Sequence, residues 1–317
     1  MPDIVHVAVA VIMNDAAEVC ISLRHKDSHQ GGLWEFPGGK IEQHETVERA
    51  LQREMREELD IEIEASRPLI TVRHDYQDKS VCLHVVMVQS YRGEVSGVEG
   101  QQVEWVPVKR LTTYEFPAAN YPIIRAVQLP DRYLITGKFI DEQDFLQKFG
   151  KALNDDIKLV QLRLKENDLE RSNVRTLIEK ASSLCEAAGA KLLFNIPENY
   201  LQTLDLSAVI FHGYHADSKT LKSLSQRPQG QLFSASCHNQ EELQKAIRLG
   251  TDFVVLSPVK KTASHPEMQA LGWQKFSSML ESCTMPVYAL GGVSEKDMVD
   301  AWSHGAQGIA AISAFWN

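Results

Sequence analysis

Three carboxylates stand close together in the segment EFPGGKIEQHETVERALQREMREELDI, at Glu54, Glu57 and Glu58. Like charges three or four residues apart on a helix repel one another, so this cluster needs an explanation. An acidic helix face that simply meets water is the simplest interpretation. The helical spacing argues against it, because Glu54 and Glu58 point in the same direction as the apolar Ala50 and Leu51.

Carboxylates that are partly buried need a cation or hydrogen-bond donors beside them. Arg53, one turn before Glu57, is one available partner. A hard divalent cation is the other, because such ions bind several carboxylate oxygens at one point. The preceding FPGGK segment favours the ion, since Pro37 fixes a backbone angle and Gly38-Gly39 allows a turn or a close approach of the backbone. We therefore predict a turn at FPGGK and a metal site on the helix that follows.

Composition narrows the classes of protein to consider. The chain has 317 residues, of which 44% are hydrophobic, and this length suits about two domains. It contains no apolar run long enough to span a membrane and no basic segment followed by an apolar one at its start, so we expect a cytoplasmic protein. Five cysteines without a C-x-x-C pair indicate reduced thiols, and a net charge of −9 argues against duplex nucleic acid as a partner.

Two patterns divide the chain near residue 130. Up to that point, β-like segments surround the one strong helix, whereas from residue 131 to 317 short apolar segments alternate with helical ones. The expected strands of this second part are YLIT (133–136), LVQLRL (159–164), LLFN (192–195), VIFH (209–212), LFSASC (232–237), FVVLSP (253–258), VYALGG (287–292) and GIAAIS (308–313). Eight such units predict a (β/α)8 TIM barrel. A doubly wound sheet is the alternative, because strand number alone does not show closure.

The acidic helix and its preceding turn match the Nudix box, G-x5-E-x7-R-E-U-x-E-E-x-G-U, in which U is apolar. Asp60 stands where the pattern has Gly, and we expect a small stability cost there because Asp tolerates left-handed geometry. The segments LWEFPGGKIE, GEVSGVEGQQVEWVPV and EFPAAN extend the likeness over residues 1–130, which resemble the MutT-type Nudix hydrolases, the 8-oxo-dGTP diphosphatases. The resemblance implies an α/β/α sandwich with a mixed sheet.

The same resemblance assigns roles to individual residues. Glu54 is the first choice for the catalytic base and Glu99 the second, and Arg53 belongs to the catalytic set. The implied metal ligands are the Gly38 carbonyl and the carboxylates of Glu54, Glu57, Glu58 and Glu99. The implied substrate-binding residues are Arg24, His29, Glu35, Phe36, Pro37, Gly38, Lys79 and Asn120. Asn120 would read the oxidised guanine with an amide that both donates and accepts, and Lys79 stands where a MutT protein has Arg.

The implied reaction depends on Mg²⁺, with Mn²⁺ as a substitute. It converts 8-oxo-dGTP to 8-oxo-dGMP and pyrophosphate, and thereby clears a mutagenic nucleotide from the pool used in DNA replication. The alternatives are another nucleoside diphosphate derivative, such as a dinucleoside polyphosphate, or a thiamine-related pyrophosphate as the substrate.

Residues 131–317 resemble the thiamine phosphate synthase and TenI family in YLITG, VQLRLKE, SPVKKTASH and ALGGVSEKD. The glycines and the last strand predict a phosphate site at Gly291, Gly292, Ile312 and Ser313. Three departures concern the synthase chemistry: Ile196 replaces an Asp, HGYHAD keeps only His212 and Asp217 of a His-Leu-Gly-Gln-x-Asp run, and His265 replaces a Lys. We expect a barrel without synthase activity, which either binds a thiazole or thiamine phosphate or has a structural role. A sensor of a thiamine intermediate that regulates the hydrolase is the third alternative.

Overall fold

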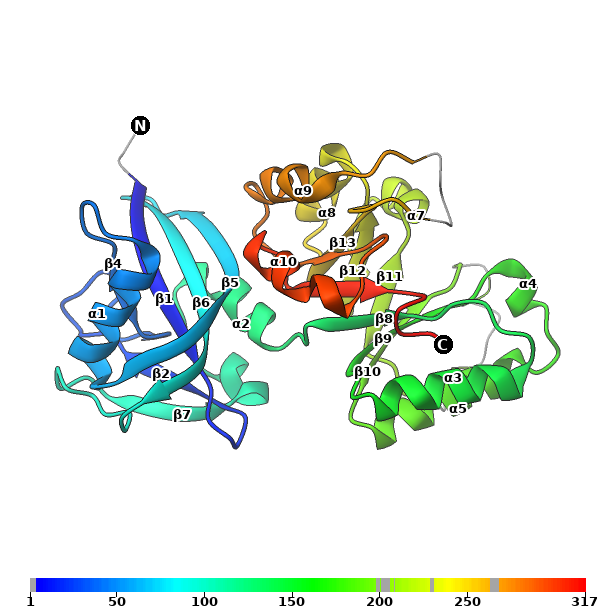
Figure 1. Cartoon of the computed structure of the whole chain (residues 1–317), viewed down its shortest axis with the longest axis horizontal. Helices are drawn as coiled ribbons and strands as arrows, with labels where there is room; N and C mark the ends of the chain where they lie inside the picture. The colour runs from blue at the N-terminus through cyan, green and yellow to red at the C-terminus, as the bar shows by residue number, and fades with distance from the viewer. Residues whose placement is uncertain (1–3, 198–199, 201–205, 208, 229–230, 263–267) are drawn as a thin grey trace. The chain divides into compact units, whose positions relative to one another are not determined.

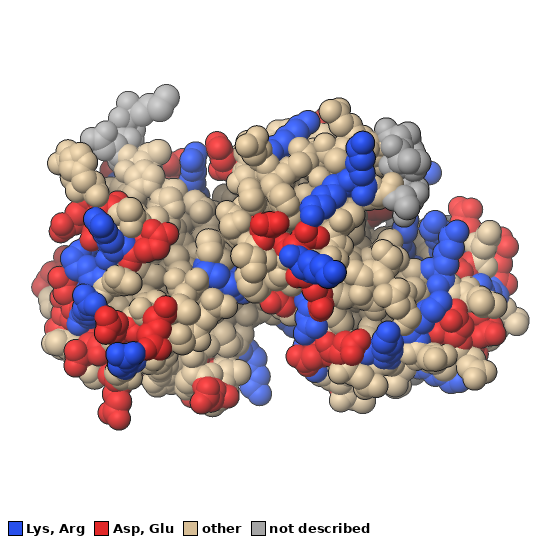
Figure 2. Space-filling view, viewed as in Figure 1, with Lys and Arg blue, Asp and Glu red and all other residues tan. Residues whose placement is uncertain are grey.

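The computed structural model describes residues 4–197, 200, 206–207, 209–228, 231–262 and 268–317. His265 therefore lies outside the described residues. The chain divides into two compact units, one of residues 1–129 and 280–286 and the other of residues 130–279 and 287–317 (Figure 1). Acidic and basic side chains are interspersed on the face of the molecule in Figure 2. Within the described ranges, no helix combines the length and the apolar character that crossing a membrane requires.

The first unit is a sandwich of sheets and helices. Its strands are β1 (Ile4–Ile12), β2 (Glu18–Leu23), β3 (Trp34–Glu35), β4 (Gly38–Lys40), β5 (Glu62–Asp75), β6 (Ser80–Arg92) and β7 (Val103–Pro107). Its helices are α1 (Val47–Leu59), α2 (Tyr121–Val127) and the 3₁₀ turns Val108–Thr113 and Ala118–Asn120. One sheet has the order β4-β1-β6-β5 and the other has the order β3-β2-β7. The first sheet is mixed, because β1 runs parallel to β6 and antiparallel to β4, which confirms the predicted class.

The central strand β1 separates two hydrophobic cores, because successive side chains of a strand point to opposite faces. Ala8 and Ala10 pack in one cluster with buried residues of α1, and Val9 and Val11 pack in a second cluster that includes α2 residues. The α1 residues buried in the first cluster are Ala50, Leu51, Met55 and Leu59. These include the apolar stripe predicted from the helical spacing, and α1 contacts both β1 and β4 (Figure 1).

The sequence predicted a turn at the glycine pair of FPGGK, and this prediction is wrong. Residues Gly38–Lys40 form the short strand β4. Gly38 pairs with Val9 of β1 and has φ +147°, and a Cβ on it would lie 2.1 Å from the Ala8 carbonyl oxygen. The missing side chain therefore serves a close approach of two strands. Sequence reasoning allowed for this second use of glycine but predicted the turn.

The second unit is a closed barrel of parallel strands. Its strands are β8 (Arg132–Ile135), β9 (Leu159–Arg163), β10 (Lys191–Asn195), β11 (Gly213–Ala216), β12 (Leu232–Cys237), β13 (Phe253–Leu256), β14 (Val287–Ala289) and β15 (Gly308–Ala311). They pair in sequence, and β15 closes the ring by pairing with β8. The outer elements are α3 (Glu142–Asn154), α4 (Glu166–Leu169), α5 (Val174–Ala187), α7 (Ser218–Ser223), α8 (Gln240–Arg248), α9 (Gly272–Leu280), the 3₁₀ turn Glu295–Asp297 and α10 (Met298–Ser303). The barrel is confirmed, and the doubly wound alternative is wrong.

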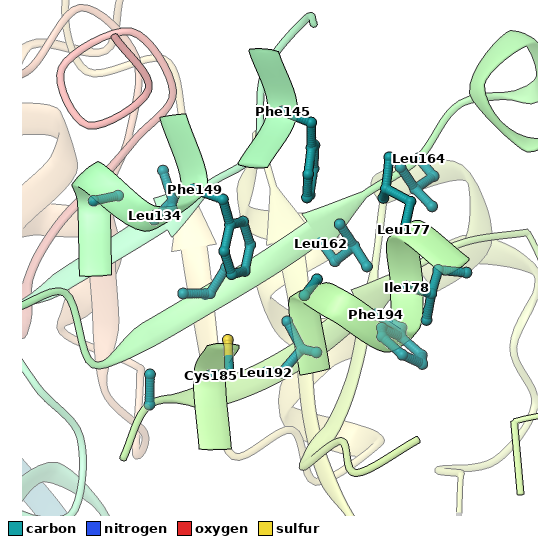
Figure 3. Close-up of a cluster of buried hydrophobic side chains, with 14 of the residues drawn as sticks. Leu134, Phe145, Phe149, Leu162, Leu164, Leu177, Ile178, Cys185, Leu192 and Phe194 are labelled. Carbon is teal, nitrogen blue, oxygen red and sulfur yellow. The ribbon is translucent and has the colours of Figure 1, made fainter. Parts of the chain in front are cut away.

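Helices α3 and α5 cover neighbouring strands of this barrel. Phe145 and Phe149 of α3 and Ile178 of α5 pack with Leu162 of β9 and Leu192 of β10 in one buried cluster (Figure 3). The phenylalanine rings stack with centroids 5.3 Å apart. Burial of this apolar surface is what attaches the two helices to the strands.

One predicted strand is misplaced. VIFH (209–212) precedes β11, whose paired residues begin at Gly213. Only the last residue of this run bonds to a barrel strand: the His212 N–H donates to the Leu192 carbonyl of β10 at 2.7 Å. Val209 and Phe211 instead join the hydrophobic cluster that contains α5. A short apolar run shows burial without showing which of its residues belong to the sheet.

Asp60 ends α1 in the left-handed conformation expected from the sequence, with φ 56° and ψ 37°. Its backbone N–H donates to carbonyls of the last helical turn, so the conformation is fixed by the cap. We predict that Asp60→Gly raises the free energy of unfolding by roughly 0.5–1 kcal/mol, because glycine adopts this geometry without strain. Denaturant unfolding measures the change. An unaltered or lower stability would show that Asp60 is not strained.

Candidate active site

Arg53 is the centre of an ion-pair network on α1. Its guanidinium donates to Glu54 Oε1 at 2.6 Å and to Glu57 Oε2 at 3.2 Å. It also donates to both carboxylate oxygens of Glu45, at 3.1 and 3.0 Å, and to the Lys40 carbonyl of β4 at 3.0 Å. The fork on Glu45 ties the segment before the helix to the helix itself. The sequence predicts a catalytic role for Arg53, and its contacts are those of a residue that positions carboxylates.

Glu58 is packed against the glycine pair. Its Oε2 accepts a hydrogen bond from the Gly38 N–H at 3.1 Å. Burial, together with the negative charges of Glu35, Glu54 and Glu99, raises the pKa of Glu58 to about 8, against the opposing effect of the Gly38 N–H. A carboxyl in these surroundings needs an added positive charge to be fully ionised at neutral pH.

Glu54 lies directly on the backbone of Gly39. A Cβ on Gly39 would be 2.0 Å from Glu54 Oε1, so only glycine leaves room for this carboxylate. Burial raises the pKa of Glu54, and the hydrogen bond from Arg53 lowers it. The two glycines therefore have separate tasks: Gly38 allows the strand pairing, and Gly39 admits the carboxylate.

Glu99 is in an exposed turn between β6 and β7. Two hydrogen bonds tie this turn to the end of α1: the Val98 N–H and the Gln101 side chain both donate to the Glu58 carbonyl, at 3.0 and 2.8 Å. The charge of Glu99 raises the pKa of both Glu54 and Glu58. The structure thus brings this distant carboxylate near the acidic helix, and its role as a ligand or base stays a prediction.

This donor set has the chemistry of a site for Mg²⁺ or Mn²⁺, which bind oxygen ligands. Burial and mutual repulsion raise the pKa of Glu54 and Glu58, and a divalent cation would relieve both effects. The oxygens do not converge here, since among the residues that the structure describes no three carboxylates have oxygens within 4.8 Å of one another. Arg53 holds Glu54 and Glu57 in ion pairs. The ligand set remains a prediction.

A cavity adjoins the glycine pair. It is lined by Val5, Val7, Val9, Arg24, His29, Gln30, Glu35, Phe36, Gly38, Gly39, Lys40, Tyr76, Lys79, Val81, Leu83, Pro117, Ala119 and Asn120. All of the predicted substrate-binding residues except Pro37 are in this lining. The carbonyl of Pro37 instead accepts a hydrogen bond from Ala10 N–H at 2.8 Å, which extends the pairing between β1 and β4.

The cavity has a charged side formed by Arg24 and Glu35. Their side chains form an ion pair, and Arg24 Nε donates to the His29 carbonyl at 3.0 Å. Burial raises the pKa of Glu35 to about 7, and Arg24 opposes the shift. His29 Nε2 lies 3.3 Å from a carboxylate oxygen of Asp78. Arg24 is therefore a cation already engaged with protein groups, so a ligand phosphate would compete with Glu35 for it.

Asn120 is a buried polar residue that is distant in sequence from Arg24, His29 and Glu35 but lines the same cavity. Its side chain is 8% exposed. It occupies the N-cap position of α2 but makes no capping hydrogen bond with its side chain. A turn or a helix cap was the alternative interpretation of this residue. Asn120 does end the 3₁₀ turn Ala118–Asn120, whereas its side chain does not cap α2. The amide is available to a ligand.

The cavity also contains aromatic groups. Phe36 is 2% exposed and stacks on Phe116 at 5.6 Å, so it is a core residue as well as part of the lining. Sequence reasoning missed Tyr76, whose hydroxyl oxygen accepts a hydrogen bond from Ala119 N–H at 3.4 Å. Its ring contacts His29 edge-on at 5.1 Å. The signal was weak, because an aromatic residue at a strand end is common.

The predicted phosphate site of the barrel has the backbone that glycine permits. Gly291 and Gly292 have φ +95° and +68°, and the Gly291 carbonyl accepts from Lys260 N–H at 2.9 Å. Ser313 is exposed, and Ile312 is partly buried. The four residues follow β14 and β15, which are neighbours in the barrel. Phosphate binding here remains a prediction.

Ile196 and His215 depart from the synthase pattern and Asp217 matches it, and all three are engaged within the fold. Ile196 is 8% exposed and belongs to the hydrophobic cluster beside α5. Asp217 is the N-cap of α7 and accepts from Thr220 N–H at 2.8 Å. His215 is buried, and burial lowers its pKa to about 3, which makes it a neutral partner of Ser234 at 2.7 Å.

Two family models match the chain. Residues 8–126 match a NUDIX domain, and residues 132–315 match TMP-TENI, thiamine monophosphate synthase. Over 118 residues the chain is 37% identical to the 8-oxo-dGTP diphosphatase of Escherichia coli (strain K12), covering 37% of this chain and 92% of that protein. It is 41% identical over 95 residues to the 8-oxo-dGTP diphosphatase of Proteus vulgaris, covering 30% of this chain and 85% of that protein.

The second unit has its own relatives. Over 192 residues the chain is 33% identical to "Putative thiamine-phosphate synthase 2" of Aquifex aeolicus (strain VF5), covering 60% of this chain and 99% of that protein. The chain therefore belongs to the Nudix family through residues 8–126 and to the thiamine monophosphate synthase family through residues 132–315.

Proposed function

We propose that the first unit is an 8-oxo-dGTP diphosphatase, which hydrolyses 8-oxo-dGTP to 8-oxo-dGMP and pyrophosphate in the cytoplasm. Its relatives with this name support the substrate. The observation that carries the proposal is the juxtaposition at Gly38 and Gly39. These residues line the cavity on one side and contact Glu58 and Glu54 on the other. A triphosphate whose base occupies the cavity would extend toward the carboxylates.

Glu54, Glu57, Glu58 and Glu99 are the groups that would hold Mg²⁺, with the Gly38 carbonyl as a further ligand. The ion, when bound, neutralises phosphate charge and lowers the pKa of a water molecule. Arg53 holds Glu54 and Glu57 through hydrogen bonds, and Glu45 holds Arg53 in turn. Glu54 takes the proton of the attacking water, because its raised pKa makes it a better base than an exposed carboxylate.

Discrimination between bases is assigned to Asn120. Its amide is buried and makes no capping bond, so an unsuitable base edge leaves it without a partner. Such a loss costs about 1–3 kcal/mol. The apolar wall of Val5, Val7 and Phe36 gives the base a surface on which to pack.

The barrel is proposed to bind a phosphate-bearing thiamine intermediate without synthase turnover. The backbone at Gly291 and Gly292 has the geometry for a phosphate cup. A synthase must neutralise a leaving pyrophosphate, and Ile196 supplies no ligand for a metal ion. Asp217 is already engaged as a helix cap.

The domains are proposed to divide between residues 130 and 131, in the gap between the two matched family models.

Removal of one acidic ligand tests the hydrolase proposal. We predict that Glu54→Gln and Glu58→Gln each lower kcat for 8-oxo-dGTP by about 10²-fold or more, because a charged ligand becomes neutral at a site that needs a cation. Steady-state assays with Mg²⁺ measure the effect, and circular dichroism checks the fold. Glu48→Gln, an exposed change on the same helix, is the matched control. Near-normal turnover of both variants would refute the metal assignment.

The glycine beside Glu54 gives a second test. Gly39→Ala places a methyl group where the Glu54 carboxylate lies, so we predict a loss of kcat similar to that of Glu54→Gln with a folded protein. Gly150→Ala, where a Cβ meets nothing within 4 Å, is the control for the same chemical change. Full activity of Gly39→Ala would mean that Glu54 does not need its position against this backbone.

Base reading is tested at Asn120. We predict that Asn120→Ala reduces the ratio of kcat/KM for 8-oxo-dGTP over dGTP by about 5- to 150-fold, the equivalent of one buried hydrogen bond. Asn120→Asp keeps the shape and removes the donor, so it reports whether donation is needed. An unchanged ratio in both variants would place base recognition elsewhere.

The barrel prediction is tested in cells that lack thiamine phosphate synthase. We predict that the full chain does not restore growth without thiamine, because one metal-binding carboxylate and one phosphate-binding cation of the synthase pattern are missing and Asp217 alone remains. Asp217→Asn is the informative variant, since Asn keeps the helix cap and removes the charge. Growth that depends on Asp217 would contradict the proposal and establish synthase activity.

A further inference from the structure

A second cluster of metal-binding side chains lies in the first unit, on the strands β1 and β6. It consists of His6 of β1 and of Cys82 and His84 of β6. One ligand atom from each residue lies within 4.8 Å of the others. Among the residues that the structure describes, no other group of three or more His, Cys, Asp or Glu residues has its ligand atoms within 4.8 Å of one another.

The pairing of two strands creates the cluster. In the parallel ladder, His6 is the partner of Cys82, and Ala8 is the partner of His84. Paired residues point to the same face of a sheet, and residues two apart on one strand do so as well. The three side chains therefore share one face because of backbone register, and their proximity does not depend on a flexible loop.

The two imidazoles are already close. His6 Nδ1 lies 2.9 Å from His84 Nε2, and the rings stack with centroids 5.3 Å apart at an angle of 18°. A tetrahedral zinc ion with Zn–N bonds of about 2.0–2.1 Å separates two nitrogens by about 3.3 Å. The nitrogens need to part by less than an ångström to admit the ion. Cys82 is 2% exposed, and its sulfur forms the buried side of the cluster.

We propose that His6, Cys82 and His84 form a binding site for Zn²⁺, with water in the fourth position. Two imidazoles and a thiolate are ligands for a borderline-soft ion and poor ligands for Mg²⁺. The acidic residues of α1 have the opposite preference. The chemistry of the donors thus keeps this site distinct from the proposed magnesium site.

Arg73 is the neighbour that a metal ion would meet first. It pairs with Cys82 from β5, and its exposed guanidinium forms a hydrogen bond with the thiol. Zinc binding replaces this contact and turns the arginine head toward solvent. We expect Arg73→Ala to bind zinc several-fold more tightly, because a competing cation is removed.

The site has a direct structural link to the cavity. Val5 and Val7 alternate with His6 along β1, and Val81 and Leu83 alternate with the β6 ligands. These four residues line the cavity on the opposite face of the same two strands. Zinc would cross-link β1 and β6 at the point where they form the wall of the cavity.

The test uses the full chain with Co²⁺ as a spectroscopic substitute for Zn²⁺, in excess Mg²⁺ to occupy the oxygen site. Thiolate ligation produces a sulfur-to-cobalt charge-transfer band, and tetrahedral geometry produces intense visible bands. We expect both at one equivalent of Co²⁺ and their loss on addition of Zn²⁺. Carboxylate ligands give no sulfur band, so the readout is independent of the hydrolase proposal.

Variants complete the test. Cys82→Ser should abolish the charge-transfer band, and His84→Gln and the exposed change His6→Gln should each weaken Zn²⁺ binding at least tenfold. Cys20→Ala, a buried thiol of the same unit, and Glu58→Gln are the controls that should keep the band. Absence of the band in the natural chain, or its persistence in Cys82→Ser, overturns the proposal. So does a zinc affinity that is unchanged in a folded His6→Gln, His84→Gln double variant.

Discussion

The contact of two carboxylates with a glycine backbone is the constraint around which the first unit is organised. Glu58 accepts a hydrogen bond from Gly38, and Glu54 lies where a side chain of Gly39 would be. Partly buried acids of like charge are unfavourable together, and their raised pKa values express that cost. Two features offset this unfavourable energy. Arg53 forms ion pairs with three carboxylates, and α1 packs against β1 and β4. A site that concentrates negative charge in this way is prepared for a cation.

Much of this arrangement could be predicted from sequence because it is local. The period of α1 placed Glu54 and Glu58 on the side of Ala50 and Leu51, and the structure has these apolar residues buried. Asp60 was expected in left-handed geometry and has it. Strand number and spacing predicted the barrel, because each βα unit carries its own pattern of burial. The one misplaced strand, at Val209–His212, was misjudged because burial in a helix-covered cluster and burial in a sheet look alike in a short run.

The remaining features are non-local and left little trace in the sequence. Tyr76 meets Ala119 and His29 only because β5 ends beside the turn before α2. Arg53 was recognisable from its spacing, yet its contact with the Lys40 carbonyl required knowledge that Gly38–Lys40 forms a strand. The pairing of His6 with Cys82 depends on the register of strands separated by more than seventy positions, as in the His6–His84 contact. Sequence patterns define faces of elements, whereas register decides which faces meet.

The barrel is fully packed and closed although Ile196 stands where the synthase pattern has a metal-binding Asp. Hydrophobic packing of α3 and α5 on β9 and β10 is complete, and closure by β15 and β8 is regular. Within that frame, Ile196 contributes to the core, and Asp217 stabilises a helix end. Ile196 thus has a structural role at the position where the synthase pattern has Asp, whereas Asp217 matches the pattern and its carboxylate also caps a helix. The glycines after β14 have positive φ angles and pack closely against the segment 258–261. A Cβ on Gly291 would lie 2.7 Å from Pro258, and one on Gly292 would lie 2.5 Å from the Lys261 carbonyl oxygen, so close packing by itself requires glycine at both positions.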